Sequence, residues 1–125
     1  MSSDPRAVVE RLIADVVNAG RVELIDELFS AELAATAREW FGSFRSSFPD
    51  LQMKIVEVVV EGDRVVGRFT CSATHTGEWR GHPPTGRRFE DVAEVYFFRV
   101  ADGRIVEGWG LEDTLSRLEQ LGLLR

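Results

Sequence analysis

The side chains best suited to chemistry in this chain are two carboxylates, a phenol and an imidazole. Glu94 and Tyr96 are separated by one residue in a run rich in valine and phenylalanine, so a strand would place both on one face. Glu112 and His75 add a second carboxylate and a ring nitrogen. A carboxyl group in apolar surroundings has a raised pKa, and a phenol can donate to a developing enolate oxygen. We therefore expect acid/base chemistry that needs no cofactor.

The segment that carries Glu94 and Tyr96 is expected to be a long strand from Phe89 to Val100. Alternation puts Phe98 on the face of Glu94 and Tyr96, and Asp91 on the other face. A slip of one residue would exchange the two faces and leave Glu94 in solvent. Tyr96 is also explained as an ordinary core aromatic. Both alternatives stay open at the level of sequence.

The rest of the chain supplies elements that would position this strand. Helical spacing of apolar residues predicts three helices in the first 48 residues, and a further amphipathic helix is introduced by Asp113 and Thr114. Asp4 and Pro5 have the character of a helix start. β-branched residues and Gly-containing turns predict strands over about 51–60, 64–75 and 104–111, and a Gly/Pro-rich loop over 78–86.

Length and composition limit the class of protein. The 125 residues, 44% of them hydrophobic, suit a single domain over 1–125. A net charge of -6 disfavours nucleic acid and anionic membranes as partners. The one cysteine, Cys71, permits no intrachain disulfide, and the two histidines alone form no metal motif, so no metal is expected. No apolar run reaches membrane-spanning length, and a cytoplasmic protein is expected.

Several short sequence motifs, in a fixed order, resemble those of the SnoaL-like polyketide cyclases of the nuclear-transport-factor-2-like superfamily. They are Phe48-Pro49-Asp50-Leu51, Glu61-Gly62-Asp63-Arg64, Thr74-His75-Thr76-Gly77, Pro83-Pro84-Thr85-Gly86-Arg87-Arg88, Asp102-Gly103-Arg104-Ile105-Val106-Glu107 and Trp109. The resemblance implies an α+β cone, with N-terminal helices packed on a strongly curved, mainly antiparallel sheet and a short C-terminal helix. It also implies a homodimer and a small hydrophobic ligand in the cone.

The resemblance bears on two positions of the site. Relatives carry an acid or a histidine, aimed into the pocket, six residues before the Asp of the last turn, and counting back from Asp102 reaches Tyr96. The polyketide aldol cyclases of the family place a catalytic Asp directly after the Trp of the last strand. Here the residue after Trp109 is Gly110, and Glu112 follows two residues later on the same face. The cyclase mechanism therefore does not transfer directly.

The remaining candidates each have a structural alternative. The expected substrate-binding residues are Asp91, Phe98, Trp109, Asp113, Trp79 and Trp40, and the expected catalytic residues are Tyr96, Glu94, Glu112 and His75. Asp113 is better explained as the cap of the last helix than as a catalytic residue. His75 either touches ligand or fastens the following loop. Trp79 is a lid or a dimer contact, and Trp40 and Trp109 belong to the core or the pocket wall.

Three functions compete for this sequence. The first is a cofactor-independent acid/base enzyme, of the cyclase or isomerase type, on a hydrophobic carbonyl-bearing molecule. The second is a non-catalytic protein that binds a small ligand, which Gly110 favours because the expected acid is missing. The third is a structural dimer module, favoured by valine and phenylalanine on both faces of the long strand.

Overall fold

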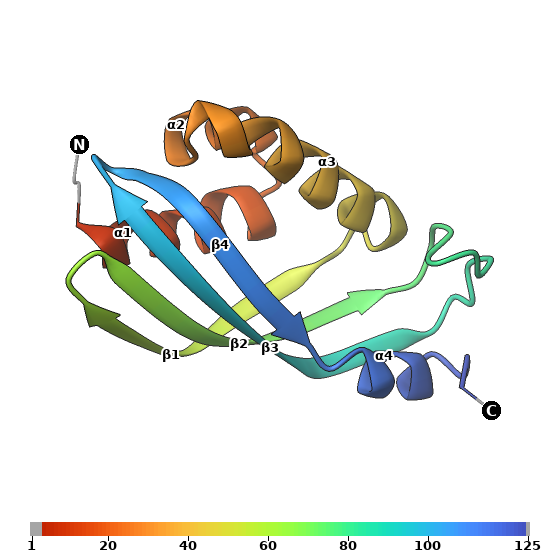
Figure 1. Ribbon diagram of the computed structural model, residues 1–125. Coiled ribbons are helices and arrows are strands. Elements are labelled where there is room, and N and C mark those ends of the chain that lie inside the picture. Colours follow the sequence, from red (N-terminus) through yellow and green to blue (C-terminus); the bar gives the residue numbers. More distant parts are fainter. Residues whose placement is uncertain (1–3, 125) are drawn as a thin grey trace.

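The protein is built from helices that lie against one face of a four-stranded sheet (Figure 1). The computed structural model describes residues 4–124, so residues 1–3 and 125 of the expected 1–125 domain lie outside the described residues. The helical elements are α1 (Pro5–Arg11), the π-helix η1 (Leu12–Asn18), the 3-10 turn η2 (Val22–Leu24), α2 (Ile25–Leu28), α3 (Ala31–Ser47) and α4 (Thr114–Gln120). The strands are β1 (Gln52–Glu61), β2 (Arg64–Thr74), β3 (Arg88–Ala101) and β4 (Arg104–Glu112).

The sheet is an antiparallel meander in the order β1-β2-β3-β4. Each strand pair contains one register shift, and such bulges bend the strands and increase their twist. The bent sheet curves around the N-terminal helices, as Figure 1 shows. The expected α+β cone with a short C-terminal helix is confirmed.

Local signals explain where the helices begin. Asp4 caps α1 by accepting a hydrogen bond from the backbone N–H of Arg6, and Pro5 occupies the first turn. Ser30 caps α3 in the same way, with Leu33 as donor. The first helix continues beyond Arg11 as a π-helix rather than an α-helix, which the apolar spacing did not predict. Its apolar side chains form much of the core.

The two faces of β3 have opposite environments, which settles the register left open by the sequence. Glu94 and Phe98 are 2% and 8% exposed on the inner face, whereas Phe97 is 46% exposed on the outer face. Glu94, Tyr96 and Phe98 therefore face the helices together. Within residues 4–124, no helix is both long and apolar enough to cross a bilayer.

Candidate functional site

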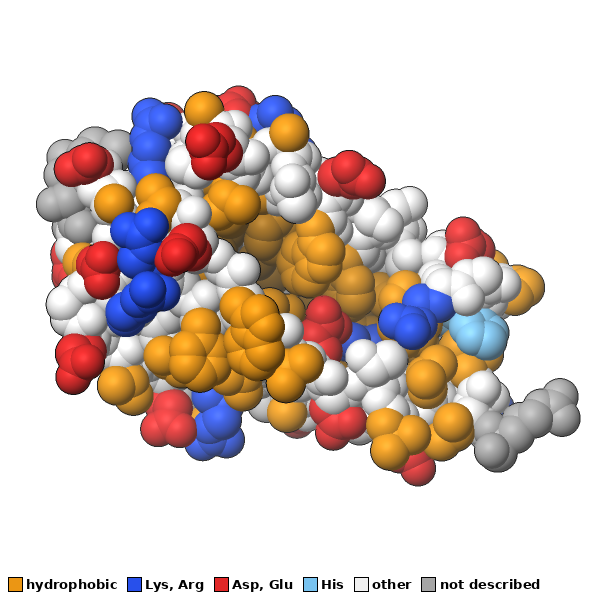
Figure 2. All heavy atoms as spheres, in the orientation of Figure 1, with side chains coloured by type: hydrophobic (Ala, Val, Ile, Leu, Met, Phe, Trp, Pro, Cys, Tyr) orange, Lys and Arg blue, Asp and Glu red, His pale blue; other side chains and the backbone are white. Residues whose placement is uncertain are grey.

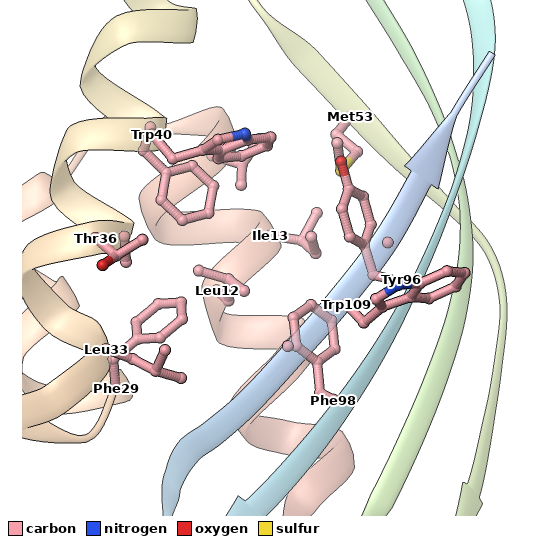
Figure 3. Close-up of a pocket in the computed structure, with 15 residues that line it drawn as sticks. Leu12, Ile13, Phe29, Leu33, Thr36, Trp40, Met53, Tyr96, Phe98 and Trp109 are labelled. Carbon is pink, nitrogen blue, oxygen red and sulfur yellow. The ribbon is translucent and has the colours of Figure 1, made fainter. Parts of the chain in front are cut away.

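An apolar cavity of about 200 Å³ lies between α3 and the inner face of the sheet (Figure 3). A space-filling view shows this part of the molecule hollowed, with hydrophobic side chains inside the hollow (Figure 2). Apolar cavities of about 150 Å³ are large enough to bind benzene. The lining residues are Leu12, Ile13, Val17, Phe29, Leu33, Thr36, Ala37, Trp40, Phe41, Met53, Tyr96, Phe98, Gly108, Trp109 and Gly110. The cavity therefore suits a small hydrophobic molecule.

A chain of hydrogen bonds begins at the one phenol of this lining. The Tyr96 hydroxyl donates to Oε1 of Glu94 at 2.7 Å. The other carboxyl oxygen of Glu94 accepts from the Arg117 guanidinium, also at 2.7 Å. A second nitrogen of Arg117 donates to Glu112 at 2.5 Å. Three of the four expected catalytic residues thus share one network, and Arg117 joins them.

Arg117 is the residue that sequence reasoning missed. It lies on α4, its side chain is 0% exposed, and its guanidinium carbon is 4.6 Å from the ring centre of Phe89 and 5.1 Å from that of Phe44. The leucines of α4 predict a helix whose arginine faces solvent. One signal was available: two carboxylates on one face of a strand pair favour a nearby cation, because buried charges are normally paired.

Burial sets the protonation behaviour of the network. It raises the pKa of Glu94, the negative charge of Glu112 raises it further, and the hydrogen bond from Tyr96 and the charge of Arg117 oppose the rise. Burial likewise raises the pKa of Tyr96, so this phenol keeps its proton at neutral pH. Tyr96 is therefore a hydrogen-bond donor, and the Glu94 carboxyl is the group that can exchange a proton.

The glycine after Trp109 has a steric explanation. Gly110 is the register partner of Tyr96 across the β3–β4 pair, and the Tyr96 ring lies directly over it. A Cβ atom at position 110 would be 2.1 Å from Cδ1 of Tyr96. An Asp at position 110 is incompatible with this placement of the Tyr96 ring. The Tyr96 ring on β3 occupies the space where the resemblance led us to expect a carboxylate from β4.

A second, polar cleft of about 310 Å³ adjoins the cavity, and Trp40 belongs to both linings. It is lined by Trp40, Ser43, Phe44, Ser47, Glu78, Trp79, Arg80, Glu112 and Thr114. The side chain of Glu112 is 23% exposed, in contrast to that of Glu94. The network therefore runs from a phenol in the apolar cavity to a carboxylate in the polar cleft.

His75 is buried away from this network and lines neither the cavity nor the cleft. Its Nδ1 accepts a hydrogen bond from the backbone N–H of Thr85 at 3.2 Å, and its backbone bonds to Gly86 and Arg87. Burial lowers its pKa. In this position His75 fastens the 78–86 loop to the end of β2. Trp79, in the same loop, is 9% exposed and packs on Phe48 rather than covering the apolar cavity.

The other expected ligand-binding residues divide between the cavity and the surface. Phe98 and Trp40 line the cavity, as Figure 3 shows. Trp109 contributes to the lining, but its ring pairs with Phe97 on the outer face and is 58% exposed. Asp91 is exposed at a positive φ of 51°, and its carboxylate lies 3.9 Å from Lys54. Asp113 caps α4 by accepting from the N–H of Ser116.

Within residues 4–124, no three side chains of the His, Cys, Asp and Glu types come together in an arrangement that could hold a metal ion. Cys71 is fully buried on β2 beside the network, and burial raises the pKa of its thiol. Such a thiol stays protonated and is a poor nucleophile.

The fold and the cavity identify the class of protein. The family model for SnoaL-like polyketide cyclases matches residues 7–121, so the chain belongs to the SnoaL-like polyketide cyclase family. Among curated proteins it is similar to the aklanonic acid methyl ester cyclase DnrD of Streptomyces peucetius. The two are 29% identical over 115 residues, which cover 92% of this chain and 77% of the cyclase.

Solved structures of Streptomyces proteins show the same architecture. TsrD from Streptomyces laurentii is 30% identical with a TM-score of 0.85, and the match covers 95% of this chain and 98% of TsrD. AclR from Streptomyces galilaeus, provisionally described as a hydroxylase, is 28% identical with a TM-score of 0.86, covering 99% and 84% of the two chains. Chains of this fold are thus associated with more than one reaction, so the activity has to be argued from the site.

Proposed function

We propose that this protein is a cofactor-independent acid/base enzyme that acts on a hydrophobic, carbonyl-bearing small molecule, with cyclisation or double-bond isomerisation as its reaction. The observation that carries the proposal is the hydrogen bond of 2.7 Å between Tyr96, in the wall of the apolar cavity, and the buried Glu94. Membership of a family of polyketide cyclases supports the substrate class.

The roles of the two residues follow from their surroundings. Tyr96 is the group that meets the substrate, and it donates to the carbonyl oxygen as negative charge develops there. Glu94 does not line the cavity itself but bonds to Tyr96, which does, so it acts behind the phenol. Because its pKa is raised towards the range useful for proton transfer, the protonated form of Glu94 can donate its proton to the Tyr96 oxygen while Tyr96 donates its phenolic proton to the substrate oxygen.

The first experiment incubates the purified protein with aklanonic acid methyl ester, the substrate named for its relative DnrD, and with simpler hydrophobic ketones. Products are followed by mass spectrometry, and solvent deuterium entering next to the carbonyl is measured in parallel. Tyr96→Phe, which keeps the ring and removes only the hydroxyl, is expected to lower turnover by about 10²–10⁴-fold. Glu94→Gln is expected to have a similar effect.

A matched control separates catalysis from general damage. Glu10→Gln changes a carboxylate that is exposed on α1 and forms an ion pair with Arg6, one turn earlier in the helix. It should leave turnover unchanged. Full turnover by Tyr96→Phe would contradict the assignment of the site.

The alternative function is ligand binding without chemistry, which the almost wholly apolar lining of the cavity favours. It predicts that hydrophobic ketones bind and quench the fluorescence of Trp40, which lines the cavity, with no turnover and no deuterium incorporation. Loss of this quenching in Trp40→Phe, at unchanged fold, would locate the bound molecule.

We also propose that the protein is a homodimer formed through the outer face of the sheet. Val59, Val66, Phe97 and Trp109 are register partners in one row across all four strands. Val59, Phe97 and Trp109 are 60%, 46% and 58% exposed. The flanking ion pairs Glu57–Arg68 and Arg99–Glu107 offer both signs of charge, which suits a self-complementary two-fold interface.

The oligomeric state is measured by light scattering coupled to size exclusion. The wild-type chain is expected at twice the monomer mass, and Phe97→Glu at the monomer mass with unchanged circular dichroism. A wild-type monomer at tens of micromolar would rule out this interface.

A further inference from the structure

Arg117 is not one of the residues that line the apolar cavity, yet it bonds to both carboxylates of the site. It reaches them from α4, whereas Glu94 and Glu112 belong to neighbouring strands. Aromatic rings of Phe44, Phe89 and Trp79 surround its guanidinium at 4.6–6.0 Å. This packing fixes the cation in one place, and the carboxylates must adapt to it.

The two carboxyl oxygens of Glu94 have different hydrogen-bond partners. Oε2 is held by Arg117, and this leaves Oε1 directed at the Tyr96 hydroxyl. Without the guanidinium, the carboxyl group would be free to rotate about its last bond. It would also lie in apolar surroundings with no cation to stabilise its ionised form.

The charges of the cluster do not balance when both carboxylates are ionised. One guanidinium faces two carboxylates, so one negative charge remains in a buried region. The other titratable groups that face Glu94 are Tyr96 on its own strand and Cys71 on β2, and both keep their protons at neutral pH. A proton on Glu94 removes the imbalance.

We propose that Arg117 is the positioning residue of this site, which holds Glu94 with Oε1 towards Tyr96 and keeps its carboxyl group able to release and take up a proton. This inference rests on the proposed function of the Tyr96–Glu94 pair and assigns α4 a part in it. Loss of the cation raises the pKa of Glu94 further, although every residue of the cavity lining is still present.

The composition of the chain provides a direct test, because Tyr96 is its one tyrosine. Protein labelled with ¹³C at the tyrosine ζ carbon gives one tyrosine resonance, whose shift reports the hydrogen bond to Glu94. A pH titration of the wild type is expected to show one step, from Glu94. Glu94→Gln should remove the step, which assigns it.

The variants separate the effect of the positive charge of Arg117 from the effect of its side-chain packing. Arg117→Met should move the step upward by about one to three pH units, since an adjacent cation lowers a carboxyl pKa by about that amount. Arg117→Lys, which keeps the charge, should stay within about one unit of the wild type. Glu112→Gln removes a like charge and should move the step downward.

Each outcome of these titrations either supports or overturns the role proposed for Arg117. A step at the wild-type midpoint in Arg117→Met, or a wild type with no step, overturns the inference. If Arg117→Met does not fold, an unmoved step in Glu112→Gln does the same, because the charge balance would then be irrelevant to Glu94. These shifts do not depend on turnover. An active Tyr96→Phe would therefore refute the proposed function and leave the control of Glu94 by Arg117 standing.

Discussion

Substituting Gly110 by alanine is the sharpest test of the site geometry. The added Cβ atom would lie 2.1 Å from Cδ1 and 2.4 Å from Cε1 of Tyr96, and 2.9 Å from the backbone oxygen of Val95. Ordinary carbon–carbon contacts are about 3.5–4.0 Å. The Tyr96 ring must therefore move by about 1.5 Å, because the backbone of β3 is held in the sheet.

The displacement has a calculable cost. The Tyr96–Glu94 bond of 2.7 Å would lengthen past the range of about 2.5–3.0 Å in which hydroxyl donors bond well. A lost hydrogen bond to a charged group costs about 1.5–3 kcal/mol, and overpacking costs about 1–3 kcal/mol. Allowing for overlap between the two, we expect the free energy of unfolding to fall by about 2–4 kcal/mol.

Chemical denaturation measures this change, and the same strand offers a matched control. Gly108 also lies on the inner face, but a Cβ atom there would meet Phe98 at 3.7 Å, an ordinary contact. Gly108→Ala should be neutral or stabilising by about 0.5–1 kcal/mol, because glycine is unfavourable within a strand. The contrast between the two alanines isolates the steric effect of Tyr96.

A double-mutant cycle provides the refutation. In a Tyr96→Ala background the space over position 110 is empty, so Gly110→Ala should then cost less than about 0.5 kcal/mol. The reasoning fails if Gly110→Ala destabilises equally in both backgrounds, or if it leaves the wild-type stability unchanged. The same background should accept Gly110→Asp, the residue found in the aldol cyclases that the chain resembles.

Three further predictions concern residues outside the cavity. Burial lowers the pKa of His75 from 6.5, so the contribution of the neutral His75 to stability is complete above that pH and is lost as the pH falls through the folded-state pKa. The melting temperature should therefore drop less between pH 7.5 and 5.5 in His75→Gln than in the wild type. An equal drop in the two proteins would contradict this. Cys71, the one cysteine, should not react with a thiol reagent until the protein unfolds, and rapid labelling of the native protein would show that it is accessible. Asp113→Ala should lower the free energy of unfolding by about 1 kcal/mol, as expected of a helix cap, and Asp113→Asn should lower it much less. A changed ligand affinity at unchanged stability would instead indicate that Asp113 contacts the substrate.

Local patterns in the sequence were sufficient to predict the architecture. The caps at Asp4 and Asp113 and the alternation along β3 depend on residues within a few positions of one another, so they are visible in one dimension. The resemblance to the family added the cone and the curved, mainly antiparallel sheet. The π-helical continuation of α1 was not predictable in this way, because α- and π-helices bury similar apolar faces.

The site itself depended on contacts between distant parts of the chain. Periodicity placed Glu94 and Tyr96 on one face, but only the packing of the helices showed that this face is the buried one. Arg117 was misleading in sequence because a charged residue within an amphipathic helix normally faces solvent. Its burial requires β3, β4 and the aromatic rings of Phe44 and Phe89 to converge on α4.

Short-range patterns along the chain were thus enough to predict the fold and the residue types available for acid/base chemistry. The packing of the whole chain decides which of those residues lie in contact. It joined Tyr96, Glu94 and Glu112 through Arg117, and it left His75 beneath a loop and Asp91 on the surface. The physical reason is that turns, caps and strand period arise from short-range sterics and hydrogen bonds. By contrast, a charge becomes buried, and a ring comes to lie over Gly110, only when segments distant in the sequence pack together.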